Sequence, residues 1–158
     1  MSSPAAQQFW DQLRLTTQSR IGLGRAGNAL PTTRVLEFNA HHAAARDAVH
    51  IPLDVPAFAA SIAAVGIGEP SMVESQASSR SEYLRRPDLG RLPASLEPVP
   101  AGSADIGVVL ADGLSPRALT EHGAGLLAAL AAALGEKYSI AAPVIATEAR
   151  VALGDHIG

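Results

Sequence analysis

The stretch that decides the fold is Asp105-Ile106-Gly107-Val108-Val109-Leu110-Ala111-Asp112-Gly113-Leu114-Ser115-Pro116. It holds a run of apolar residues that ends at an Asp-Gly pair, which predicts a buried strand followed by a tight loop. Ser115 is a preferred helix N-cap residue and Pro116 suits the first helical position, so a helix should begin here. The stretch therefore predicts the opening of an α/β unit.

The residues that follow complete one β-α-β unit. Leucines recur from Leu119 to Leu134, and Gly135 is placed to end the helix. A second short apolar run, residues 143–147, predicts the next strand. Two parallel strands do not form a stable sheet, because parallel sheets are covered on both faces and hold about four to six strands. We therefore expect a partial Rossmann-like (doubly wound) domain over residues 103–158, cut short within a larger α/β domain.

Residues 1–95 are expected to form a small helical N-terminal domain. Apolar spacing and capping residues predict helices in four segments, 4–17, 32–49, 56–65 and 79–85. The segment Met72-Val73-Glu74-Ser75 is too short to assign and is either a strand or extended chain. The proline-rich residues 92–102 are the best candidate for a linker between the two domains. The expected fold class is thus α/β.

Composition argues against several classes of function. The net charge is -3, from 12 Lys and Arg against 15 Asp and Glu, which disfavours a nucleic-acid partner. The absence of cysteine leaves neither a disulfide framework nor a thiolate metal site. Neither a secretory signal nor an apolar stretch of about 20 residues is present, so no membrane span is expected. We expect a soluble, cytoplasmic protein.

A glycine-rich segment, residues 22–27, fits the dinucleotide-binding pattern G-x-G-x-x-G, with Asp47 about 20 residues further on. That pattern must leave a strand and open a helix so that helix N–H groups meet the pyrophosphate. Here a polar helix precedes it and Asn-Ala-Leu-Pro follows. We therefore interpret the segment as a tight turn that presents Arg20 and Arg25.

No catalytic or metal-binding constellation is evident. His41, His42 and His50 lie near Asp47, but their spacing does not place three ligands on one helix face. We interpret them as capping and interface residues. Ser115 lacks the second glycine of a nucleophile elbow, and its hydroxyl is already expected to cap a helix. Catalytic residues and metal ligands are accordingly both expected to be none.

Four arginines gather between residues 80 and 91, around Tyr83 and a Pro-Asp-x-Gly turn. They are Arg80, Arg85, Arg86 and Arg91. Arginine and tyrosine are concentrated at protein interfaces, so a partner surface is one interpretation of this cluster. A solvated face is the other, and both stay open at this point.

Several motifs occur in an order that resembles the light chain (small subunit) of bacterial ethanolamine ammonia-lyase. They are Gly24-Arg25-Ala26-Gly27, Arg46-Asp47-Ala48-Val49, Arg86-Pro87-Asp88-Leu89-Gly90-Arg91, Asp112-Gly113-Leu114-Ser115 and Gly154-Asp155-His156-Ile157-Gly158. The match runs from about residue 13 to the last residue. Residues 92–98 depart from the pattern, because prolines stand where the family continues a helix.

The resemblance implies a subunit of a carbon–nitrogen lyase that converts ethanolamine to acetaldehyde and ammonia. In that family the heavy chain, a TIM barrel, holds the substrate, and adenosylcobalamin lies between heavy and light chains. The implied partner is therefore the heavy chain in a hetero-oligomer, with a bacterial microcompartment as a further possible location. The isolated chain is expected to be inactive.

The resemblance also implies where cobalamin contacts would lie. Ligands of open α/β folds bind beyond the carboxyl ends of the strands, and the second predicted strand ends just before Arg150 and Val151. These two residues are the expected cofactor contacts. Two alternatives stay open, a nucleotide-binding α/β subunit and a non-catalytic scaffold without cobalamin.

Overall fold

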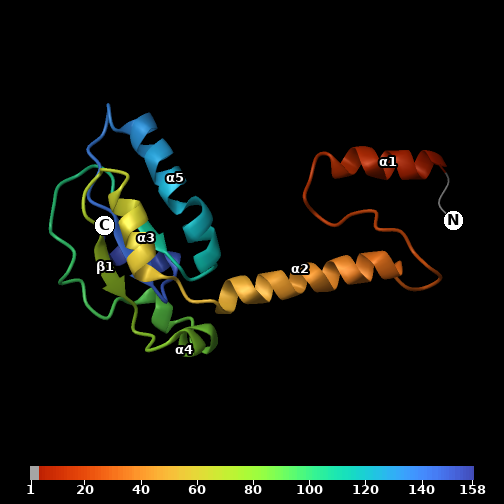
Figure 1. Cartoon of the computed structure of the whole chain (residues 1–158), viewed down its shortest axis with the longest axis horizontal. Coiled ribbons are helices and arrows are strands. Elements are labelled where there is room, and N and C mark those ends of the chain that lie inside the picture. The colour runs from red at the N-terminus through yellow and green to blue at the C-terminus, as the bar shows by residue number, and fades with distance from the viewer. Residues whose placement is uncertain (1–3) are drawn as a thin grey trace. The chain divides into compact units, whose positions relative to one another are not determined.

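The computed structural model describes residues 4–158, which form helices and one small sheet (Figure 1). By compactness the chain forms two units, the first ending at Ala45 and the second spanning residues 46–158. The elements in chain order are α1 (Pro4–Arg14), α2 (Thr32–His50), α3 (Val55–Ala63), β1 (Ser71–Glu74), α4 (Arg80–Arg85), the 3-10 helix η1 (Leu89–Arg91), β2 (Val109–Ala111), α5 (Pro116–Leu134), β3 (Val144–Thr147) and the 3-10 helix η2 (Val151–His156).

The sheet of the second unit has three parallel strands in the order β1-β3-β2. In register, β3 pairs Ala146 with Val73 of β1 and Ile145 with Leu110 of β2. The sheet therefore has one strand more than the two expected in the β-α-β unit, since residues 71–74, which the sequence left open as strand or extended chain, form the third. The fold is mixed α/β, as predicted, whereas the doubly wound arrangement stays a prediction.

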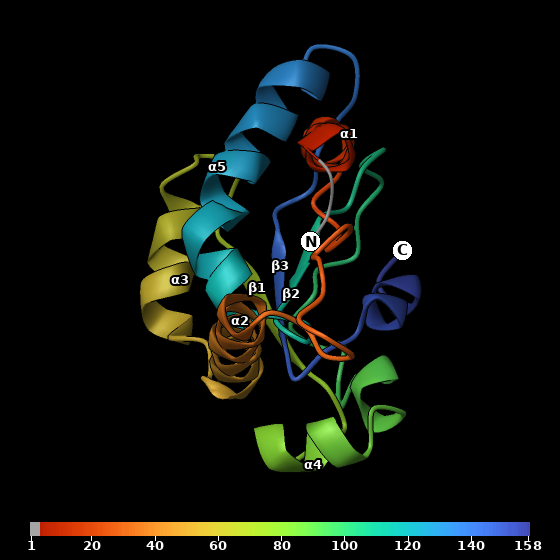
Figure 2. The ribbon, with the colours of Figure 1, turned by 90° about the vertical axis from the view of Figure 1, so that its right-hand side faces the viewer.

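One face of the sheet is covered by α3 and α5 (Figure 2). Their contact is close because α5 has Gly123 at the crossing, where a Cβ would lie 2.9 Å from the ring of Phe58. The buried apolar side chains on this face are Leu53, Phe58, Ile62, Leu110, Leu127 and Ile145. At roughly 1.5–3 kcal/mol for each large apolar side chain, this cluster is the main stabilising core of the unit.

The other face is covered by irregular chain and by η2, whose Leu153 is fully buried. Leu96 and Val99, from the stretch predicted as a linker, pack against this cluster. The same stretch is tied to the end of β1, since the Ala94 N–H donates to the Glu74 carbonyl at 2.8 Å. Residues 92–102 therefore pack on the sheet, and the division into domains 1–95 and 103–158 stays a prediction.

The helix boundaries coincide with capping residues. The Ser115 hydroxyl accepts from the Ala118 N–H at 3.2 Å and Pro116 opens α5, which ends at Gly135 as predicted. Asp54 caps α3 and Ser79 caps α4 in the same way. None of the helices within residues 4–158 combines the length and apolarity needed to cross a bilayer.

The first unit confirms that the glycine-rich segment is a turn. Gly22, Gly24 and Gly27 have φ values of 59°, 81° and 64°, in the left-handed region that glycine tolerates best. At Gly22 an added Cβ would lie 2.5 Å from the Trp10 ring, so the turn packs closely on α1. In the part of the chain that the structure describes, α1 precedes this turn and the next helix begins only at Thr32, so the strand–loop–helix context of a dinucleotide-binding loop is missing there.

Candidate functional site

An open hollow of about 620 Å³ lies at the carboxyl ends of β2 and β3. The strands end at Ala111 and Thr147, and the loops that leave them form two sides of the hollow. The lining residues are Tyr83, Arg91, Ala111, Gly113, Leu114, Ala149, Arg150, Val151, Ala152 and Asp155. This is the edge at which open α/β sheets bind ligands.

The apolar part of the hollow is formed by two exposed aliphatic side chains, one from each loop. Leu114 is 87% exposed and Val151 is 90% exposed. Leaving such side chains in water forgoes about 1.5–3 kcal/mol each, which a bound molecule would recover by covering them. The pair therefore offers an apolar surface beside the strand ends.

The polar part of the hollow comes from Arg91, Arg150 and Asp155. The backbone of Arg150 is fixed, because its N–H donates to the carbonyl of Gly90 at 2.8 Å. Both residues predicted as cofactor contacts, Arg150 and Val151, thus line one hollow. A hollow that joins apolar side chains to a few charged groups is the usual form of a small-molecule site.

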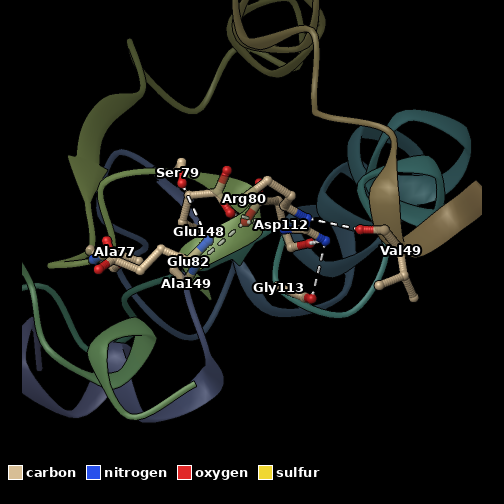
Figure 3. Close-up of polar contacts among 10 residues, drawn as sticks. Val49, Ala77, Ser79, Arg80, Glu82, Asp112, Gly113, Glu148 and Ala149 are labelled. Carbon is tan, nitrogen blue, oxygen red and sulfur yellow. Dashed lines mark hydrogen bonds and ion pairs between the residues drawn. The ribbon is translucent and has the colours of Figure 1, made fainter. Parts of the chain in front are cut away.

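An ionic cluster centred on Arg80 lies at the loops that leave β2 and β3, and its two acids line a second hollow beside Ser75 and Ser79 (Figure 3). The Arg80 side chain is 10% exposed, and its Nη1 lies 3.5 Å from both Asp112 Oδ1 and Glu148 Oε2. Its Nη2 donates to the backbone oxygens of Asp112 and Gly113, each at 3.2 Å. Its Nε donates to the Val49 carbonyl at 2.9 Å. One guanidinium therefore joins the end of α2 to the loops after β2 and β3.

Tyr83 lies on α4, as Arg80 does, and packs against this cluster. The Arg80 guanidinium lies 5.1 Å from the centre of the buried Tyr83 ring. The backbone packs so closely around the tyrosine that a Cβ at Gly90 or Gly113 would collide with its ring or hydroxyl. Both glycines belong to motifs noted in the sequence. Because glycine has no side chain, the backbone at both positions can pack directly against Tyr83.

The ionisation of the two acids is set mainly by burial. Removal from water raises the pKa of the Asp112 carboxyl, and the positive charge of Arg80 partly opposes this. Burial also raises the pKa of Glu148, and the negative charge of Asp112 adds to the effect. Two carboxyls thus compete for one guanidinium in a site with little water.

The structure corrects the interpretation of the arginine cluster. Arg80 lies on neither a partner surface nor a solvated face, because it is buried against Asp112 and Glu148. Arg85 is exposed, and Arg86 forms an exposed ion pair with Asp88 at 2.7 Å. The cluster therefore divides into one internal arginine, Arg91 at the hollow and two outward-facing residues.

The histidines are dispersed among different contacts. Nδ1 of His41 lies 2.5 Å from Arg20 Nη2, and His42 stacks on Phe38 with ring centres 6.1 Å apart. Within residues 4–158 no group of three or more His, Asp or Glu side chains is arranged to hold a metal ion. The hollow is therefore the strongest candidate site of this part of the chain.

Of the residues that line the hollow, only Arg150 and Val151 were predicted as contacts, and the missed ones include Tyr83, Arg91, Leu114 and Asp155. Leu114 carried a usable signal, since it follows Asp112-Gly113 directly after a predicted strand. Tyr83 and Arg91 had no comparable signal, because they reach the hollow only when α4 and η1 pack near η2, which lies far away in the sequence. The site thus combines the loops after β2 and β3 with residues of α4 and η1, and the sequence predicted contacts only in the loop after β3.

Together these features define a class of protein, an α/β chain with an open hollow at the carboxyl edge of a parallel sheet. The sequence matches the family model for the ethanolamine ammonia-lyase light chain over residues 7–158. The chain therefore belongs to the ethanolamine ammonia-lyase light-chain family.

Relatives named ethanolamine ammonia-lyase small subunit support the same assignment. The protein of Rhodococcus erythropolis is 68% identical over 149 residues, covering 94% of this chain and 58% of the relative. That of Ralstonia nicotianae is 41% identical, covering 96% of this chain and 59% of the relative. That of Xanthomonas campestris pv. campestris is 40% identical, covering all of this chain and 62% of the relative. The chain thus spans about three fifths of these relatives.

Proposed function

We propose that this chain forms part of the adenosylcobalamin surface of an ethanolamine ammonia-lyase, in a hetero-oligomer with the large subunit. The observation that carries the proposal is the hollow at the carboxyl ends of β2 and β3, where Leu114 and Val151 are exposed side by side with Arg150. The reaction that we propose for the assembled enzyme is the one the resemblance implies, conversion of ethanolamine to acetaldehyde and ammonia.

The residues of the hollow fit a large amphipathic cofactor. A corrin has apolar methyl groups and rim amides, which match exposed aliphatic side chains next to charged groups. Leu114 and Val151 would cover apolar parts of the ring, and Arg91 and Arg150 would donate to amide oxygens. The hollow is smaller than the cofactor and open to one side, which agrees with a cofactor shared between two chains.

The division of labour follows from the same residues. Adenosylcobalamin, when bound, supplies the radical chemistry of the lyase, and protein supplies placement and exclusion of water. In this chain the apolar pair would exclude water and the arginines would orient the ring edge. We assign no catalytic residue here and place the substrate-handling residues on the large subunit.

We further propose that the sheet is part of a Rossmann-like domain in the longer proteins of the family. The three strands are parallel, and the proposed ligand lies at their carboxyl ends, as in doubly wound folds. The face covered by residues 92–102 and η2 is the place where this domain would differ from a regular one.

Gel filtration of the chain with an ethanolamine ammonia-lyase large subunit and adenosylcobalamin tests the proposal. We expect corrin absorbance to elute with both proteins and acetaldehyde to form only when the large subunit is present. Association without retained corrin would favour a scaffold role, and displacement of the corrin by a nucleotide would favour a nucleotide-binding subunit. Acetaldehyde production by the isolated chain would contradict the proposed division of labour.

A further inference from the structure

The segment 148–150 joins β3 to Val151 in a conformation that needs support. Glu148 has a φ of 52°, in the left-handed region that a residue with a side chain seldom adopts. Such a conformation persists only where the surrounding structure holds it. The contacts of this segment therefore decide where Val151 lies.

Each residue of the segment is held by a different element. The Glu148 carboxylate lies 3.5 Å from Arg80 Nη1, and the Ala149 N–H donates to Asp112 Oδ1 at 3.3 Å. The Arg150 N–H donates to the Gly90 carbonyl at 2.8 Å. Val151 itself is almost fully exposed, so its own packing contributes little to its position.

Arg80 connects these supports to one another. It pairs with Glu148 and with Asp112, the residue that accepts from Ala149, and it also donates to the backbone oxygens of Asp112 and Gly113. Its Nε is used for Val49. Only a planar fork with five donors can serve this many acceptors, so lysine is not an equivalent replacement.

We propose that Arg80 is a positioning residue for the cofactor surface: its guanidinium fixes residues 148–150 and thereby places Val151 at the hollow. The part that concerns cobalamin rests on the proposed function. Buried ion pairs add little net stability compared with apolar residues, but they can fix a single arrangement of the groups around them. Arg80 acts here through the loop and is not itself a ligand contact.

Amide hydrogen exchange in the cofactor-free chain tests the structural part of this proposal. Arg80→Lys keeps the charge and loses the fork, so the Ala149 and Arg150 amides should exchange at least about tenfold faster. The Ile145 and Ala146 amides should stay as protected as in the unsubstituted chain. Arg85→Lys is the matched control on the same helix, since Arg85 is exposed, and it should change none of these rates.

Two outcomes of that experiment overturn the proposal. One is unchanged exchange at Ala149 and Arg150 in Arg80→Lys, and the other is an equal acceleration in Arg85→Lys. If Arg80→Lys fails to fold, Glu148→Gln takes its place, because this partly exposed side chain can lose its charge without a loss of volume. Faster exchange of the Ala149 amide in Glu148→Gln supports the proposal, and unchanged exchange contradicts it.

Adenosylcobalamin affinity, measured with the large subunit present, tests the functional part. We expect Arg80→Lys to weaken binding about tenfold, as is typical when a group that orients a ligand contact is removed. Arg117→Lys, an exposed arginine on α5 that does not line the hollow, should bind cobalamin as the unsubstituted chain does. If the unsubstituted chain binds no cobalamin, the proposed function is wrong. The hydrogen-exchange experiment still tests whether Arg80 holds residues 148–150. Faster amide exchange in Arg80→Lys with an unchanged affinity for adenosylcobalamin would show that Arg80 does not position the cofactor surface.

Discussion

The backbone N–H of Ala149 donates to the Asp112 carboxylate, 3.3 Å away. Asp112 directly follows β2 and Ala149 lies two residues after β3, so this bond joins the exits of two neighbouring strands. Because Asp112 also pairs with Arg80, the bond belongs to the same buried cluster. The loops that line the hollow are therefore also held by Asp112 and Arg80, which do not line it themselves.

The close contact at Gly113 should make this position intolerant of a side chain. A Cβ there would collide with the Ala149 carbonyl and the Tyr83 hydroxyl, and the carbonyl belongs to the backbone and cannot rotate away. Gly113→Ala should therefore lower the free energy of unfolding by about 1–3 kcal/mol, the usual cost of overpacking. Urea denaturation followed by circular dichroism would measure it.

Gly125 provides the matched control for that substitution. It lies inside α5, it is exposed, and a Cβ there would meet nothing within 4 Å. Gly125→Ala should raise the free energy of unfolding by about 0.5–1 kcal/mol, because alanine is the better helix former. Equal effects of the two substitutions would contradict the packing described around Tyr83.

The pH dependence of stability should reveal the partly buried Glu148 carboxyl. Its pKa is raised in the folded state, so between the ordinary and the raised pKa the folded chain binds more protons than the unfolded one. This contribution to stability is fully present below the ordinary pKa and is lost as the pH rises through the raised one.

Glu148→Gln removes the titration of this side chain. The difference in stability between the unsubstituted chain and this variant therefore reports the effect of Glu148. Exposed acids such as Glu82 and Asp88 have lowered pKa values and act in the opposite direction, so the comparison must be between variant and unsubstituted chain. Relative to Glu148→Gln, the unsubstituted chain should lose stability as the pH rises across this window. A difference that is constant with pH, measured by urea denaturation, would show that Glu148 titrates normally.

Arg85 and Arg86, which face outward at the end of α4, should contribute to association with the large subunit and little to the stability of the chain. Arg85 is exposed, and Arg86 has only an exposed partner, Asp88. The double substitution Arg85→Ala and Arg86→Ala should weaken co-purification with the large subunit and change the free energy of unfolding by less than about 0.5 kcal/mol for each residue. A large fall in the melting temperature with unchanged association would identify them as structural residues.

Local signals predicted much of the fold. Ser115, Pro116 and Gly135 fixed both ends of α5, and Asp54 fixed the start of α3, because caps act on backbone groups within a few residues. The strand before Asp112 was also predicted, although β2 begins only at Val109, after an isolated bridge between Ile106 and Ile140. The position of the hollow followed from the same signals, since it lies where these strands end.

Interactions between distant residues were not predicted. β1 has four residues, too few for a periodic pattern, and becomes a strand because β3 offers it a parallel partner. Arg80 resembled its neighbouring arginines in the sequence, and its burial depends on acids 32 and 68 residues away. Such pairings are decided by tertiary packing, for which a single sequence carries no local signal.

The central claim is that Val151 belongs to a cobalamin surface, and adenosylcobalamin affinity in the presence of the large subunit tests it most directly. Val151→Asp places a charge on that surface, and Leu126→Asp places one on α5, where Leu126 is 68% exposed and outside the hollow. We predict that Val151→Asp weakens cobalamin binding at least about tenfold, that Leu126→Asp leaves it unchanged, and that neither changes the free energy of unfolding by more than about 0.5 kcal/mol. Unchanged affinity in Val151→Asp, or equal losses in both variants, would contradict the claim.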